Sequence, residues 1–228
     1  MIPFVPSDPF PLITNPPYQE EQEHAEKVDH WLGLNIGDVE ELLAQKGCRS
    51  RARGSLREEQ NLWIGLAVKS LLTPYTETRS MLEYLKPEKG STVIDLGAGY
   101  GRMGFVIGRH FPGVHFVGYE YVGERVKEGR RCISNFHYDG IKLEHVDLST
   151  PDFSPLPAEY YFIYDFGSTK AIEKTLHDLR RIALKRPITV VGRGRHCRDL
   201  IERRHPWLSA VAIPEHRGIN SVYRTVFG

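Results

Sequence analysis

The feature that most constrains the fold is a group of glycines that directly follows a short apolar segment. Residues 93–96 have the length and β-branched content of a buried strand, with Asp95 near its end. Glycines follow at positions 97, 99, 101 and 104, and the apolar residues from Met103 onward have helical spacing. Glycine adopts φ > 0 and lets the backbone approach a ligand closely, and a helix N-terminus presents unpaired N–H groups. The segment therefore predicts a strand, a glycine turn and a helix that bind a ligand with an anionic group and a nucleoside.

Two nucleoside-binding patterns compete for these glycines. The dinucleotide pattern G-x-G-x-x-G fails from Gly97, because Arg102 occupies the place of the third glycine. From Gly99 the pattern is complete, but it then begins two residues after the natural strand end. The pattern acidic-x-G-x-G-x-G, formed by Asp95, Gly97, Gly99 and Gly101, fits in register.

Three further apolar segments also lead to acidic residues. Residues 114–120 end at Glu120, residues 141–147 end at Asp147, and residues 160–167 contain Asp165 near their end. Each carboxylate taken alone could be a turn residue or a helix cap. Four of them behind apolar strands instead indicate a shared site, because the carboxyl ends of parallel strands line the ligand crevice of an open α/β sheet.

The pattern at residues 95–101, followed by these strands, resembles the class I S-adenosylmethionine-dependent methyltransferases. The resemblance implies an α/β fold with a Rossmann-like, seven-stranded, mostly parallel sheet, helices on both faces and an antiparallel last strand. It implies that the glycine turn passes under the methionine part of S-adenosylmethionine, that Glu120 accepts the ribose hydroxyls, and that Asp147 binds the adenine amino group. The residues expected to bind the cofactor are Asp95, Gly97, Ala98, Gly99, Gly101, Glu120, Tyr121, Asp147, Leu148, Thr73 and Tyr75.

The rest of the chain divides into three parts by composition. Residues 1–18 form a proline-rich leader, expected to lie extended over a surface or to be disordered. Residues 19–79 form a helical extension, with helices expected over 20–31, 36–46 and 56–72 and a basic loop over 46–53. Residues 80–228 form the methyltransferase domain, in which helices over 169–184 and 196–205 alternate with strands over 187–192, 208–213 and 221–227.

The end of the fourth strand is expected to bind the methyl acceptor. Tyr164, Asp165 and Phe166 are the expected catalytic residues, because they combine aromatic rings with a carboxylate. Burial among aromatic rings would favour the neutral form of a lysine amine, whose ordinary pKa is about 10.4. The segment around Thr73 and Tyr75 resembles the entrance loop of the non-SET protein-lysine methyltransferases. An N-cap by Thr73 or Thr76, and a helix cap by Asp165, remain alternatives.

A second methyltransferase motif lies in the wrong place. Residues 15–18, Asn-Pro-Pro-Tyr, match the signature of enzymes that methylate amino groups of adenine or glutamine. In those enzymes the motif follows the fourth strand, whereas here it precedes the glycine turn by some eighty residues. We therefore assign it no catalytic role.

Composition excludes few partners. The formal net charge of +1 disfavours a general polyanion binder, so nucleic acid is disfavoured as a substrate without being excluded. Three separated cysteines and scattered histidines predict no metal site and a reducing compartment. No signal peptide or membrane-spanning run is visible, which predicts a soluble, cytoplasmic protein.

The expected function is methyl transfer to a protein lysine. A small-molecule or RNA methyltransferase and a non-catalytic cofactor-binding module remain alternatives, and a dinucleotide oxidoreductase is disfavoured by the position of the glycines. The sequence leaves the oligomeric state open.

Overall fold

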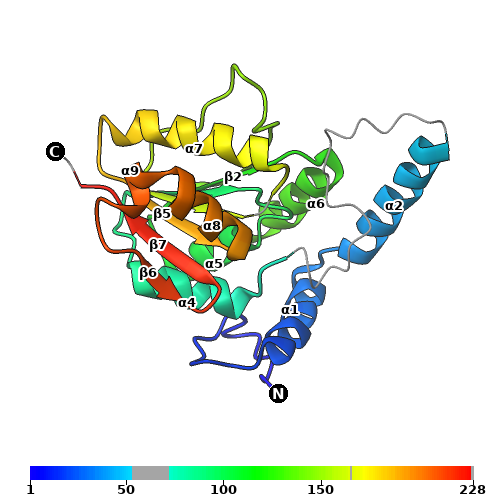
Figure 1. Cartoon of the computed structure of the whole chain (residues 1–228). Coiled ribbons are helices and arrows are strands. Elements are labelled where there is room, and N and C mark those ends of the chain that lie inside the picture. The colour runs from blue at the N-terminus through cyan, green and yellow to red at the C-terminus, as the bar shows by residue number, and fades with distance from the viewer. Residues whose placement is uncertain (53–71, 165, 227–228) are drawn as a thin grey trace.

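The apolar segments of the sequence form one central sheet. In the computed structural model, which describes residues 1–52, 72–164 and 166–226, the described strands form a seven-stranded sheet in the order β3-β2-β1-β4-β5-β7-β6 (Figure 1). The strands are β1 (Thr92–Leu96), β2 (His115–Glu120), β3 (Ile141–His145), β4 (Tyr160–Ile163), β5 (Thr189–Arg193), β6 (Glu215–Arg217) and β7 (Asn220–Arg224). β1 to β5 pair in parallel, and β7 runs antiparallel to β5 and β6. The predicted fold class is confirmed.

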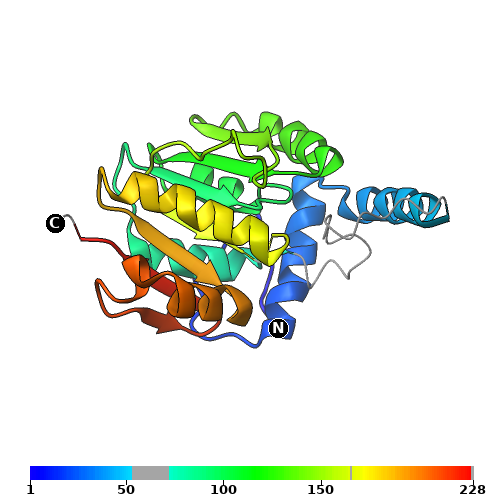
Figure 2. The ribbon, with the colours of Figure 1, turned by 45° about the horizontal axis from the view of Figure 1, so that its top comes forward.

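Helices cover both faces of this sheet (Figures 1 and 2). α4 (Tyr75–Leu85), α5 (Arg102–His110) and α6 (Gly123–Ile133) pack on one face, with α1 (Tyr18–Leu32) beside α4. α7 (Thr169–Ala183), α8 (Arg195–Arg204) and α9 (Pro206–Ser209) pack on the other face. The strands are apolar on both sides, as a sheet covered on both faces requires: Val93 of β1 points to the first layer and Ile94 to the second.

The leader packs on the surface of the helices, which is the first of its two expected arrangements. Phe10 is fully buried and its ring stacks on Tyr75 of α4, with ring centroids 5.1 Å apart. Phe4 packs against Trp31 of α1 at 6.1 Å. After α1, the helix α2 (Ile36–Ala52) extends away from the sheet in both views.

Three local predictions were wrong. α2 does not stop at Gly47 but runs to Ala52, so most of the predicted basic loop 46–53 is helical. A glycine inside a helix costs only about 1 kcal/mol, and good helix formers flank this one. The strand predicted over 208–213 is instead α9 followed by a turn, because Pro206 starts a new helix at its first position. α4 begins after Pro74 with no side-chain cap from Thr73 or Thr76.

Two helix predictions are confirmed, and a third helix prediction falls almost entirely outside the described residues. α7 and α8 occupy the predicted ranges to within a residue, and the short 3-10 helix η1 (Ser134–Phe136) follows α6. The helix predicted over 56–72 lies almost entirely outside the described residues. In the described ranges, no helix is both long and apolar enough to cross a membrane.

Candidate functional site

The glycine turn has the geometry that the sequence predicts. Gly97, Gly99 and Gly101 all have positive φ, of 96°, 55° and 77°. The N–H groups of Gly97 and Ala98 both donate to the carbonyl of Tyr119 at 2.9 Å, which ties the turn to the end of β2. Gly101 is the N-cap of α5. Only glycine adopts three such conformations at low cost, so the turn explains the glycine pattern.

Asp95 is a buried carboxylate without a partner for one of its oxygens. It is 8% exposed in the middle of the sheet, where its backbone pairs with Gly118 of β2 and Phe162 of β4. No hydrogen bond reaches its Oδ1 atom from the described residues. Burial raises the pKa of Asp95 to about 7, and the nearby charge of Glu120 adds to this increase. A buried group in this state would be stabilised by a cationic or hydrogen-bonding ligand.

Glu120 lies beside the glycine turn and accepts hydrogen bonds from the backbone. Its Oε2 atom accepts from the N–H of Gly99 at 2.9 Å, and its Oε1 atom accepts from the N–H of Val122 at 2.8 Å. The guanidinium of Arg125 lies 4.0 Å from Oε1. Each carboxylate oxygen can accept a second hydrogen bond, so Glu120 keeps acceptor capacity for a ligand. The structure thus brings Asp95, the glycines and Glu120 together.

The remaining residues predicted on the cofactor side lie near the end of β2 and in the loop after β3. The N–H of Val146 donates to the carbonyl of Glu120 at 2.9 Å, which places this loop beside that strand end. The Oδ1 atom of Asp147 accepts from both the N–H and the hydroxyl of Ser149, at 2.8 and 2.6 Å. Leu148 is buried, and Tyr121 is 38% exposed. The contact of Asp147 with adenine, and the contacts of Tyr121 and Leu148 with the cofactor, stay predictions.

The segment around Thr73 meets the end of β4 across the turn. The hydroxyl of Thr73 donates to the hydroxyl of Tyr164. Phe166 lies directly against Gly97, where an added Cβ would come within 2.4 Å of the Cβ of Phe166. Burial raises the pKa of Tyr164 well above its ordinary value, so the phenol stays neutral.

The structure does not test the predicted catalytic role of Asp165, but it bears on the alternative role of this residue as a helix cap. Asp165 lies outside the described residues. Its alternative role as the cap of α7 is filled by Ser168, whose hydroxyl accepts from the N–H of Ala171 at 3.2 Å.

Tyr75 and Arg102 hold the N-terminal helix against the glycine turn. Tyr75 is fully buried, and its hydroxyl donates to Oδ1 of Asp29 in α1 at 2.7 Å. The guanidinium of Arg102, the residue after Gly101, pairs with the same carboxylate through two nitrogens and donates to the carbonyl of Thr73 at 3.0 Å. The place of the third glycine in a dinucleotide pattern is thus occupied by an arginine that anchors α1.

A second buried pair ties α2 to the same turn. Glu40 accepts from the hydroxyl of Tyr100 and from the guanidinium of Arg125, both at 2.8 Å. The N-terminal extension is thus joined to the glycine turn at two points.

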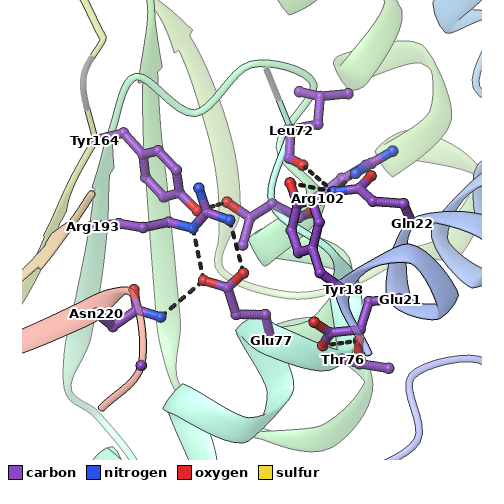
Figure 3. A network of polar contacts seen from close by, with 12 residues as sticks. Tyr18, Glu21, Gln22, Leu72, Thr76, Glu77, Arg102, Tyr164, Arg193 and Asn220 are labelled. Atoms are coloured by element: carbon purple, nitrogen blue, oxygen red, sulfur yellow. Dashed lines mark hydrogen bonds and ion pairs between the residues drawn. The ribbon is translucent and has the colours of Figure 1, made fainter. Parts of the chain in front are cut away.

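A polar network beside the end of β4 was missed by the sequence analysis (Figure 3). Arg193, at the end of β5, makes two bonds of 2.7 and 2.8 Å to Glu77 of α4, and Asn220 of β7 donates to Glu77 at 2.8 Å. The guanidinium of Arg193 lies 4.7 Å from the centre of the Tyr164 ring and bonds to the hydroxyl of Tyr18. Burial lowers the pKa of Arg193, but Glu77, Tyr164 and Tyr18 together raise it above its ordinary value.

Two residues of this network belong to segments that stand out in the sequence. Tyr18 ends the Asn-Pro-Pro-Tyr segment, and Arg193 opens the Arg-Gly-Arg segment after the fifth strand. Neither segment indicates that the two side chains meet. Among the described residues, no group of three or more His, Cys, Asp or Glu side chains could hold a metal ion.

Comparison with known proteins identifies the fold. No protein-family model matches the sequence, and no curated protein matches it either. Precorrin-6y C5,15-methyltransferase from Geobacter metallireducens is 14% identical, with a TM-score of 0.51 over 72% of this chain and 94% of that chain. A SAM-dependent methyltransferase from Aquifex aeolicus is 12% identical, with a TM-score of 0.50 over 66% of this chain and 90% of that chain.

A third solved structure has a higher sequence identity to this chain than these two. An RNA methyltransferase from Salinibacter ruber, in complex with S-adenosyl-L-homocysteine, is 23% identical, with a TM-score of 0.48 over 68% of this chain and 92% of that chain. The chain has the Rossmann-like methyltransferase fold, as the first two of these structures and the strand order show.

Proposed function

We propose that this chain is an S-adenosylmethionine-dependent methyltransferase that methylates a lysine amine of a protein substrate. The observation that carries the methyltransferase proposal is Asp95, a buried carboxylate with one unpartnered oxygen at a turn of three glycines with positive φ. Burying such a group without a ligand costs stability, which is typical of a binding site and not of a structural turn.

The residues at the turn fit the parts of this cofactor. Asp95 would accept the ammonium group of the methionine part, and the free acceptor capacity of Glu120 would take the ribose hydroxyls. The backbone of the glycine turn would lie against the ligand, since it carries no Cβ. The cofactor, when bound, supplies a methyl group on a sulfonium centre, and the protein contributes chiefly by aligning the acceptor with it.

The acceptor proposal rests on the groups between α1, α4 and the end of β4. The rings of Tyr18 and Tyr164 come from opposite sides of this region, and Glu21 adds a carboxylate near Glu77, whose own charge is paired with Arg193 (Figure 3). Burial raises the pKa of Glu21, and the neighbouring charge of Glu77 adds to the increase. Carboxylates attract an ammonium group, while aromatic burial favours the neutral amine that reacts. Asp165 would steer and orient this amine.

Label transfer from S-adenosylmethionine tests both parts of the proposal. The purified chain is incubated with cofactor labelled in the methyl group and with a cell extract, and the product is hydrolysed in acid. Label in methylated lysines supports the proposal. Label confined to RNA, to a small molecule or to glutamine contradicts the lysine acceptor but keeps the methyltransferase. Absence of any transfer by a chain that binds the cofactor supports a non-catalytic binding module instead.

A further inference from the structure

A cavity lined by basic side chains lies on the helical layer formed by α7, α8 and α9. Its volume is about 210 Å³, and its walls are His177, Arg180, Arg204, His205, Pro206 and Trp207. α7 and α8 both begin at the carboxyl edge of the sheet, where β4 and β5 end. The cavity is lined by the second half of α7 and the end of α8, so it lies toward the opposite edge from the glycine turn.

The charges around this cavity are mostly positive. Arg204 pairs with Glu173 of α7, with 2.5 Å between Nη1 and Oε1. Arg180 is exposed at the cavity wall, and it pairs with no carboxylate of the described chain. The ring of His177 lies edge-on to that of His205, with centroids 5.5 Å apart. One carboxylate thus faces two guanidinium groups and two imidazoles.

His205 lines the cavity, but its unpartnered nitrogen is buried. It is 3% exposed, and its Nδ1 atom accepts from the indole N–H of Trp207 at 3.2 Å. Burial lowers the pKa of His205, and the charge of His177 adds to the decrease. The neutral ring therefore carries its proton on Nε2, where no acceptor is found among the described residues. An unmet buried donor of this kind costs stability, and the groups that the cavity offers to a ligand are those of His177, Arg180, Arg204 and Trp207.

We propose that this cavity binds a phosphate group. The guanidinium groups of Arg180 and Arg204 match the several acceptor oxygens of phosphate, and the net positive charge matches its negative charge. The half-buried indole of Trp207 forms part of the same wall, held by its bond to His205, and its face suits stacking of a nucleobase attached to the phosphate. The site is independent of the proposed methyl transfer, since no residue at the cavity wall contributes to the glycine turn.

Calorimetry with three probes tests the proposal. Inorganic phosphate, uridine 5′-monophosphate and uridine are titrated separately into the full chain, with S-adenosylhomocysteine present in excess to block the glycine turn. We expect the two phosphate-bearing probes to bind with a Kd of about 1 mM or tighter, and uridine not to bind. Tighter binding of the nucleotide than of phosphate supports a nucleotide site with Trp207 as its stacking surface, and equal binding supports a site for free phosphate. No phosphate binding at about 10 mM overturns the proposal.

Two matched variants locate the site. Arg180→Gln removes an exposed, unpaired guanidinium at the cavity and is expected to weaken phosphate binding about 10-fold or more. Arg181→Gln, its neighbour on α7, removes a guanidinium that pairs with Asp178 and is expected to leave binding unchanged. In NMR spectra, phosphate should shift the indole N–H signal of Trp207 in the wild type. Equal loss in both variants, or unchanged binding in Arg180→Gln, would contradict a site in this cavity.

Discussion

Replacing Asp95 by asparagine should remove a pH-dependent destabilisation of the ligand-free protein and weaken its cofactor binding. Burial moves the pKa of Asp95 from its ordinary value of 3.8 to about 7 in the folded state. A carboxyl group with a raised folded-state pKa contributes stability below its unfolded pKa, and this contribution is lost as the pH rises to the folded value. Asp95 therefore destabilises the folded chain progressively between about pH 4 and pH 7, by at most about 4 kcal/mol.

Asparagine removes this charge but keeps a polar group of similar shape. Its buried amide keeps a desolvation cost of about 1–3 kcal/mol at every pH, so the pH dependence is the informative quantity. We expect the free energy of unfolding of Asp95→Asn, relative to wild type, to rise by about 2–3 kcal/mol between about pH 5 and pH 7.5. Urea denaturation at both pH values measures it. The exposed Asp152→Asn serves as the control, with no such rise.

The same linkage predicts how ligand affinity depends on pH. Pairing with an ammonium group requires ionised Asp95, so binding of S-adenosylhomocysteine below about pH 7 must release a proton. The affinity of the wild type should fall by up to about 10-fold per pH unit below this value, whereas Asp95→Asn should show a weak and flat affinity. A flat wild-type affinity, or a variant whose relative stability does not change with pH, would refute the assignment of Asp95.

Three further predictions concern the surroundings of the turn. Asp29→Ala leaves the guanidinium of Arg102 buried without its partner and should destabilise the chain by about 3–5 kcal/mol in urea denaturation; a loss below about 1 kcal/mol would contradict the anchoring of α1. Gly97→Ala places a Cβ against Phe166 at positive φ and should abolish S-adenosylhomocysteine binding in calorimetry, so normal binding would mean that the turn faces elsewhere. Asp165→Asn should lower turnover far more than cofactor affinity in single-turnover kinetics, and an equal loss of both would place this residue on the cofactor side instead.

The sequence was most informative where the structure is set by local spacing. The strand at residues 92–96, the positive φ of Gly97, Gly99 and Gly101, and the burial of Glu120 beside them follow from patterns within about thirty residues. The seven-stranded, mostly parallel sheet with an antiparallel last strand followed from the resemblance of that motif to a known family, because parallel strands and helices alternate in only a few ways.

Contacts between distant segments could not be predicted in this way. Arg102 looked like a defect in a glycine pattern until its pairing with Asp29, 73 residues earlier, was seen. Glu77 and Arg193 are 116 residues apart and carry no pattern that links them. The end of α2 and the start of α9 were missed for another reason: Gly47 and Pro206 each have two common roles, and packing decides between them.

Binding of S-adenosylhomocysteine and of NAD, measured by calorimetry on the same preparation, tests the central claim most directly. Wild type should bind S-adenosylhomocysteine and show negligible binding of NAD. Glu120→Ala should weaken the affinity for S-adenosylhomocysteine by about 1.5–3 kcal/mol through loss of the ribose hydrogen bonds, while Glu124→Ala, on the adjacent helix, should leave it unchanged. Tight binding of NAD, or full affinity in a folded Glu120→Ala variant, would contradict the account.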